Sequence, residues 1–246
     1  MIIVAISLLL LVLFNDQAVS SKLPKTWKIC RKSDPEINEC LKVAVENAIH
    51  DLKDGNPSLG VLPLDPLRFN KILIDQGNGP VSLKLEFIDL DIIGFTNMKI
   101  TSFKNNWKEM QFEGIVPSLI FDGKYTADGK VLVLPVKGDG HCRYTFDNFV
   151  IKATLKLKEF EKGGHHFLEV TDFSFNMETD RMHVQFDNLF NGDKALGEST
   201  NAFLNQNWKE ILNELKPSIS KAFGSGYKEI SNRIFSKIPI EEFSPA

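Results

Sequence analysis

Apolar residues recur at three- and four-residue steps in two regions, one near the beginning of the chain and one near its end. The first region, from Ile37 to Asp54, predicts an amphipathic helix that Gly55 ends. The second, from Ala195 to about Phe235, predicts one long helix. Its apolar stripe consists of Leu204, Trp208, Ile211, Leu215, Ile219, Ala222, Ile230 and Ile234. We expect a kink at Pro217 and a looser backbone at Gly224-Ser225-Gly226.

Between the two helical regions the apolar period changes to two, which is typical of β-strands. The parity set by Val81, Leu83, Leu85 and Phe87 switches at Ile88, so a bulge or strong bend is expected. Further strands are predicted at Asn97–Phe103, Lys108–Gly114, Ser118–Tyr125, Lys130–Val136, Arg143–Phe160, His165–Asn176 and Arg181–Phe186. The predicted turns are Asp122-Gly123, Asp128-Gly129, Asp139-Gly140 and Gly163-Gly164.

The strands are expected to have one buried apolar face and one solvent-exposed face. In the clearest strand, Ile151 and Leu155 lie on the apolar face, and Lys152 and Lys156 lie on the exposed face. The segment Val61–Ile74, which contains two prolines, is expected to be extended. A meandering antiparallel sheet curled around the long helix, with room between the two layers, gives the fold class α+β. No linker-like stretch divides the chain, so residues 21–246 are expected to form one domain.

An apolar run from Ile2 to Phe14 precedes this domain and is too short for a membrane span. It predicts a signal peptide over residues 1–20 and a secreted, extracellular protein with no stable membrane insertion. A retained amino-terminal anchor is the alternative.

The chain has 29 Lys and Arg against 32 Asp and Glu, which indicates neither a nucleic-acid nor an anionic-membrane partner. Its 19 Phe against 3 Tyr favour a dry apolar interior.

Cysteine spacing agrees with export, because Cys30 and Cys40 flank an Asp34-Pro35 turn and are expected to form a disulfide. Cys142 is then unpaired. A buried free thiol is favoured over an intermolecular disulfide. A metal site with His141 or with His165-His166 lacks the ligand spacing of zinc sites, so neither a metal nor a cofactor is expected.

Several motifs resemble the insect takeout and juvenile-hormone-binding protein family, which includes circadian clock-controlled proteins. The motifs are the Cys30–Leu41 opening, Leu64-Asp65-Pro66-Leu67, Gly123-Lys124-Tyr125 with Gly129, Gly138-Asp139-Gly140, Asn191-Gly192-Asp193, and Asn201-Ala202-Phe203-Leu204-Asn205 with Asn207-Trp208. The resemblance implies a long helix wrapped by a highly curved antiparallel sheet around a hydrophobic tunnel, similar to half of a bactericidal/permeability-increasing protein. It also implies a carrier of a small lipophilic ligand such as juvenile hormone, another terpenoid or a long-chain lipid, with links to feeding, circadian output or chemosensation.

The candidate ligand-binding residues lie on strand faces or on the long helix. They are Phe87, Ile92, Phe95, Ile120, Tyr125, Phe149, Ile151, Phe173, Phe175, Phe203 and Trp208. Any ester or epoxide of a ligand needs a hydrogen-bond partner, and Tyr125 and Tyr144 qualify by type, although either hydroxyl can equally face solvent.

The sequence bears on two other classes of function. Catalysis is not expected, because the sequence shows no recognisable combination of a nucleophile, a base and an oxyanion donor. Gly224-Ser225-Gly226 does not match the G-x-S-x-G motif of a nucleophile elbow. A module that binds lipid surfaces or another protein, without a specific small ligand, is the alternative to a carrier. The basic row Lys152, Lys156 and Lys158 is its only support, and an ordinary solvated face is the favoured explanation of that row. A monomer is expected.

Overall fold

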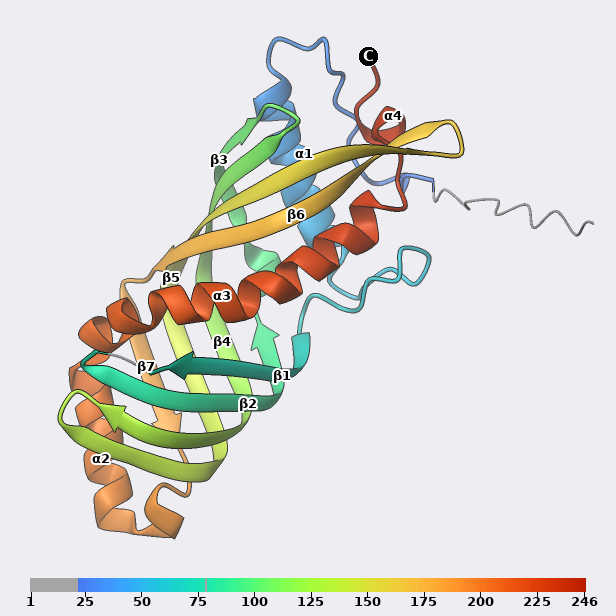
Figure 1. Ribbon diagram of the computed structural model, residues 1–246. Coiled ribbons are helices and arrows are strands. Elements are labelled where there is room, and N and C mark those ends of the chain that lie inside the picture. The colour runs from blue at the N-terminus through green and yellow to red at the C-terminus, as the bar shows by residue number, and fades with distance from the viewer. Residues whose placement is uncertain (1–21, 78) are drawn as a thin grey trace, which may run out of the picture.

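The computed structural model describes residues 22–77 and 79–246, so the predicted signal peptide lies outside the described residues. One long helix lies across the concave face of a curled antiparallel sheet in an elongated molecule (Figure 1). The elements are α1 (Ile37–Asp51), β1 (Leu67–Gln76), β2 (Val81–Ile93), β3 (Lys99–Asn105), β4 (Glu109–Val131), β5 (Leu134–Lys162), β6 (His165–Glu178), β7 (Arg181–Phe186), α2 (Lys194–Gln206), α3 (Trp208–Phe235) and α4 (Ile240–Phe243). The predicted class α+β is confirmed.

The seven described strands form one sheet in the order β1-β2-β4-β5-β6, with β3 paired to β4 and β7 paired to β5. All pairs are antiparallel, and β4 and β5 stay paired from Glu109↔Lys156 to Val131↔Leu134. Strands of this length accumulate so much right-handed twist that the sheet curls. Ile151 and Leu155 on β5 are buried and Lys152 is exposed, which confirms the predicted dry and wet faces.

Three of the four predicted turns are wrong. Asp122-Gly123 and Asp128-Gly129 lie inside β4, and Asp139-Gly140 lies inside β5. These glycines allow close approach of backbones instead: a Cβ on Gly123 would lie 2.9 Å from Leu90 Cα, and one on Gly140 2.8 Å from the Asp187 carbonyl oxygen. The strands predicted separately at 108–114 and 118–125 are therefore one. The Gly163-Gly164 turn is confirmed between β5 and β6.

The predicted irregularity of β2 is also confirmed. Its register with β4 shifts between Ile88 and Asp91, and Asp89 has a φ of 50°. The segment Val61–Ile74 was expected to be an extended connection. Its second half is extended but forms part of strand β1, so the prediction holds in part.

The carboxy-terminal helix is broken at Asn207, not at Pro217, which lies inside continuous α3. Whether Pro217 kinks α3 stays a prediction, whereas the expected loosening at Gly224-Ser225-Gly226 is not seen, because the helix continues through these residues. A Cβ on Gly224 would lie 2.5 Å from the Phe173 carbonyl oxygen, and one on Gly226 would lie 2.3 Å from the Phe69 ring. These glycines let α3 pack directly against β6 and β1.

Three asparagines fasten the helices to strand backbones. Asn201 of α2 accepts from the Phe186 N–H at 2.9 Å and donates to its carbonyl at 2.9 Å. Asn205 makes the same pair of bonds to Val184, at 2.8 Å each. Asn232 of α3 pairs with Val170 at 2.7 and 3.0 Å. A residue on an edge strand has a backbone N–H and carbonyl with no neighbouring strand to bond, and each asparagine amide bonds this pair instead. The bonds of Asn201 and Asn205 to β7 explain why α2 follows β7 and turns away from α3.

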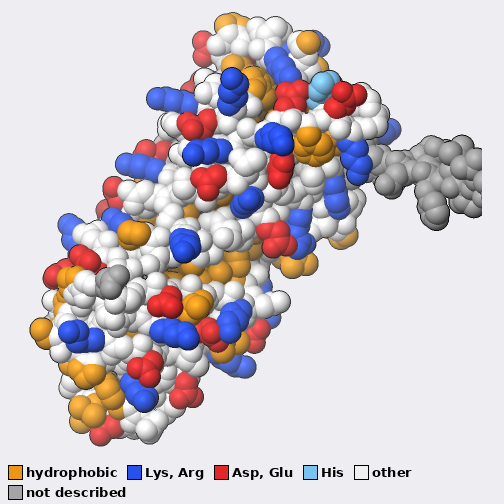
Figure 2. Space-filling model, viewed as in Figure 1, with side chains coloured by type: hydrophobic (Ala, Val, Ile, Leu, Met, Phe, Trp, Pro, Cys, Tyr) orange, Lys and Arg blue, Asp and Glu red, His pale blue; other side chains and the backbone are white. Residues whose placement is uncertain are grey.

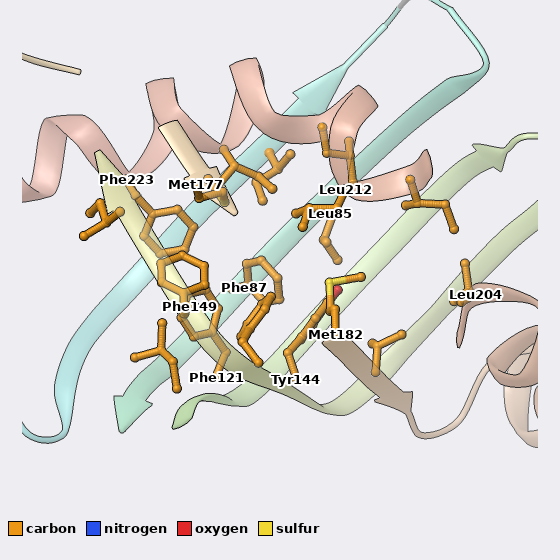
Figure 3. Close-up of a pocket in the computed structure, with 18 of the residues that line it drawn as sticks. Leu85, Phe87, Phe121, Tyr144, Phe149, Met177, Met182, Leu204, Leu212 and Phe223 are labelled. Carbon is orange, nitrogen blue, oxygen red and sulfur yellow. The ribbon is translucent and has the colours of Figure 1, made fainter. Parts of the chain in front are cut away.

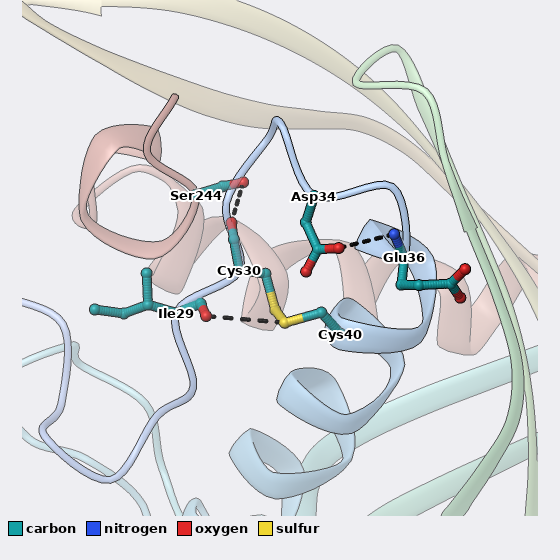
Figure 4. The surroundings of a disulfide bond; sticks show 6 residues. All are labelled: Ile29, Cys30, Asp34, Glu36, Cys40 and Ser244. Atoms are coloured by element: carbon teal, nitrogen blue, oxygen red, sulfur yellow. Dashed lines mark hydrogen bonds between the residues drawn. A yellow bond between two sulfur atoms is a disulfide. The ribbon is translucent and has the colours of Figure 1, made fainter.

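The disulfide Cys30–Cys40 is present and ties the amino-terminal segment to α1 (Figure 4). The Cys30 N–H donates to the Phe243 carbonyl at 3.0 Å, and the Ser244 hydroxyl donates to the Cys30 carbonyl at 2.7 Å. Both described ends of the chain therefore meet at one end of the molecule (Figure 1). Closing this short loop stabilises the fold by about 2–3 kcal/mol in the chain-entropy treatment.

Candidate ligand-binding site

Two apolar cavities lie in line between α3 and the sheet. Chamber 1, with a volume of about 80 Å³, lies under the first half of α3, and chamber 2, of about 220 Å³, lies under its second half. Each is several times larger than the space that one water molecule needs. Cavities with hydrocarbon walls stay dry and take up apolar molecules.

Chamber 1 joins the inner faces of six strands to the helices, and Figure 3 shows its side chains converging from opposite walls. Its walls are Ile74, Leu83, Leu85, Phe87, Phe95, Met98, Val116, Leu119, Phe121, Ala127, Val131, Val136, Tyr144, Phe146, Phe149, Ile151, Phe175, Met177, Met182, Val184, Phe186, Leu204, Ile211, Leu212, Leu215, Ile219, Phe223 and Tyr227.

Chamber 2 lies between α1, the other end of the sheet and the end of α3. Its walls are Leu23, Trp27, Lys28, Leu41, Ala44, Val45, Ala48, Ile49, Leu52, Leu64, Leu67, Phe95, Phe103, Met110, Phe112, Ile151, Leu155, Phe173, Tyr227, Ile230, Ser231, Ile234, Phe235, Ile238 and Phe243. The amino-terminal segment covers it, and the Trp27 Nε1–H donates to the Asp51 carboxylate at 3.0 Å.

Helical periodicity places one face of α3 along both chambers. Ile211, Leu215, Ile219, Phe223 and Tyr227, each four residues apart, line chamber 1. Tyr227 also lines chamber 2, which continues along the helix past it. With a rise of about 1.5 Å per residue, the lined face extends over roughly 35 Å.

Six of the candidate residues line a chamber. Phe87, Phe149 and Phe175 line chamber 1, Phe173 lines chamber 2, and Phe95 and Ile151 line both. Their contact with a ligand stays a prediction.

The other five candidates line neither chamber. Ile92 is fully buried in β2, paired with Phe121 of β4. Ile120 is on the opposite face of β4 from Leu119, which lines chamber 1. The Tyr125 hydroxyl donates to the Asp187 carbonyl at 2.7 Å, so it serves the fold. Phe203 and Trp208 are half-buried beside the helix break, where α2 follows β7 and turns those faces from the cavity.

Sequence reasoning missed the residues at the centre of the site, above all Phe223 and Tyr227. Phe69, Phe121 and Phe223 form a chain of ring contacts, with centroids 5.5 Å apart at each step. The signal was present, because the four-residue spacing from Ile211 to Ile219 continues through Phe223 and Tyr227.

Two tyrosine hydroxyls meet these apolar walls. Tyr144 extends from β5 into chamber 1 beside Met182 (Figure 3), which favours the first of the two alternatives left open for it by the sequence. Burial raises the pKa of Tyr144 and of Tyr227. Neither hydroxyl has a protein hydrogen-bond partner among the described residues, and both tyrosines line cavity walls.

Cys142 is a buried free thiol, which confirms the favoured reading and leaves it unavailable for an intermolecular disulfide. Within residues 22–77 and 79–246, no cluster of three or more His, Cys, Asp or Glu side chains is arranged to hold a metal ion. Over the same residues, no helix combines the length and the apolar character that a membrane crossing requires.

Stability is expected to fall at alkaline pH. Burial, followed by the nearby Asp122 and Asp187 carboxylates, raises the pKa of the Cys142 thiol to about 12, and burial raises the pKa of Tyr144 and Tyr227. In the unfolded chain a thiol loses its proton near pH 8.5 and a phenol near pH 10. The unfolded state therefore binds fewer protons above these values, and stability that is complete below about pH 8 is lost as pH rises.

Urea unfolding between pH 7 and 11 checks this expectation. The unfolding midpoint should hold to about pH 8 and then fall, and Cys142→Ala should reduce the fall between pH 9 and 10. A constant midpoint up to pH 11 would contradict the account.

The fold and the site together define a class of protein: an α+β domain in which a curled antiparallel sheet wraps around one long helix and encloses apolar chambers between them. The chain belongs to the haemolymph juvenile hormone binding protein family, which it matches over residues 8–245.

Individual relatives agree with this assignment. The chain is 27% identical to the circadian clock-controlled protein daywake of Drosophila melanogaster, over 91% of this chain and 89% of that protein. It is 23% identical to a Schistocerca gregaria protein described as "Putative beta-carotene-binding protein", over 87% and 86% of the two chains. The crystal structure of Takeout 1 from Epiphyas postvittana shares the fold with a TM-score of 0.78, at 23% identity, covering 89% of this chain and all of that one.

Proposed function

We propose that this protein is a secreted carrier that holds one small lipophilic molecule in chambers 1 and 2. The ligand is juvenile hormone, another terpenoid or a long-chain lipid. The observation that carries the proposal is the pair of apolar chambers in line along α3. The description of the Schistocerca relative, "Putative beta-carotene-binding protein", agrees with this ligand class.

Apolar burial alone is sufficient for useful affinity. A chain of about 16 carbons gains roughly 13 kcal/mol at ~0.8 kcal/mol per methylene, and association costs about 4 kcal/mol or more. Micromolar or tighter binding follows without a polar contact. The Tyr144 hydroxyl adds a donor for a ligand oxygen inside chamber 1.

The proposal has further parts. The protein acts as an extracellular monomer, with residues 1–20 as its signal peptide and residues 21–246 as one domain, and it has no catalytic activity. Phe87, Phe95, Phe149, Ile151, Phe173 and Phe175 contact the ligand. A role in circadian, feeding or chemosensory physiology is the corresponding proposal at the level of the organism.

Binding to lipid surfaces finds less support. On the face in Figure 2, Lys and Arg are interspersed with Asp and Glu. Of the predicted basic row, Lys152 Nζ lies 3.9 Å from a Glu113 carboxylate oxygen. No single-sign patch is visible on that face to attract an anionic membrane.

Uptake of a fluorescent fatty-acid probe by delipidated protein tests the proposal, with displacement by juvenile hormone and by palmitate. Saturable uptake of one probe per chain, competed by either compound and insensitive to salt, is expected. No uptake, together with salt-sensitive sedimentation on anionic phosphatidylserine vesicles, would support the surface-binding alternative.

A further inference from the structure

Three residues, Phe95, Ile151 and Tyr227, line both chambers and so lie where chambers 1 and 2 meet. They come from a short 3-10 helix after β2, from β5 and from α3. Tyr227 stacks on Phe95 with the ring centroids 5.9 Å apart and the planes 14° apart. Because the Tyr227 ring lies where the chambers meet, its position affects how they communicate.

The Tyr227 ring is held from several sides. Its centroid lies 5.5 Å from that of Phe173 and 5.7 Å from that of Phe175, both on β6. Phe69 of β1 approaches it edge-on at 6.1 Å, and this approach depends on the missing side chain of neighbouring Gly226. A ring clamped in this way keeps its hydroxyl at a fixed place in the cavity.

That hydroxyl has no protein partner among the described residues. A phenol buried in hydrocarbon without a hydrogen bond is costly, so the arrangement suits a partner that arrives with the ligand. Tyr125 is the contrasting case, because its hydroxyl is already bonded to the Asp187 carbonyl.

From this geometry we propose that Tyr227 is a specificity-determining residue: its hydroxyl donates a hydrogen bond to an oxygen in the middle of an elongated ligand, whose hydrocarbon arms occupy the two chambers. The ligand class is an apolar chain with an internal carbonyl, ester or ether oxygen. This inference rests on the proposed carrier function and adds where the ligand's polar atom lies.

The test compares octyl octanoate with heptadecane, which have equal numbers of chain atoms, as competitors of the fluorescent fatty-acid probe. Tyr227→Phe keeps the ring and removes the donor. It should weaken octyl octanoate binding about three- to tenfold and leave heptadecane within about twofold, as expected for loss of one hydrogen bond. Tyr125→Phe, the matched control, should change the affinity of neither compound.

Three results would overturn the inference: an unchanged ester affinity in Tyr227→Phe, an equal loss for both compounds, or an ester-specific loss in Tyr144→Phe alone. An equal loss would mean that Tyr227 only shapes the cavity. Failure of the carrier function itself is a separate result, because wild-type protein would then take up no probe at all.

Discussion

Filling either chamber with a phenyl ring is expected to weaken ligand binding about a hundredfold while the fold survives. Ala127 of β4 lines chamber 1, and Ala44 of α1 lines chamber 2. Ala127→Phe or Ala44→Phe puts a ring where we place the ligand. Displacing about four methylenes at ~0.8 kcal/mol each costs roughly 3 kcal/mol of binding free energy. Displacement titration with the fluorescent probe measures the loss.

Two matched variants separate cavity filling from damage to the protein. Ala202→Phe adds the same ring on the exposed face of α2 and should leave affinity unchanged. Ala153 is 2% exposed and lines neither chamber, so Ala153→Phe should destabilise the fold by about 1–3 kcal/mol through overpacking. Full affinity in both chamber variants would show that the ligand lies elsewhere.

Asn201→Ala is expected to destabilise the protein by about 2–4 kcal/mol. The Asn201 amide bonds both the N–H and the carbonyl of Phe186, and its removal leaves the N–H without a partner and the carbonyl with only the long 3.4 Å bond from the Gln185 amide. The Phe186 ring packs at 4.5 Å from Tyr125 and 5.6 Å from Tyr144, so the loss extends to one wall of chamber 1. Urea unfolding measures the change.

Asn213→Ala is the control for this substitution. Asn213 is exposed on α3, and alanine there should change stability by a few tenths of a kcal/mol in the favourable direction. Equal stability of Asn201→Ala and Asn213→Ala would mean that the bonds to Phe186 do not hold α2 on the sheet.

Local pattern was sufficient to predict which regions of this fold are helical and which are strands. The four-residue steps after Ile37 and the two-residue alternation around Ile151 each report which face of an element is buried. The break at Asn207 was missed because it depends on the bonds of Asn201 and Asn205 to β7, which no local pattern contains. The turns assigned to Asp-Gly pairs failed for a similar reason, since a glycine that admits a neighbouring backbone resembles a turn glycine in sequence.

The site was harder to predict than the fold. The sequence of an apolar strand face does not show whether a residue packs against a neighbour or borders a cavity. On β2, Ile92 is buried in the core, whereas Phe87 lines chamber 1. The chamber walls depend on where α3 lies over the sheet, which close contacts at Gly224 and Gly226 decide. Tyr227 was overlooked because its role arises only where the two chambers meet.

Native mass spectrometry of the protein purified from its own tissue, followed by identification of the compound released on denaturation, tests the carrier proposal most directly. The account predicts one lipophilic molecule per chain, a terpenoid or long-chain lipid with an internal oxygen. A protein that arrives empty and takes up no lipophilic compound afterwards would contradict it.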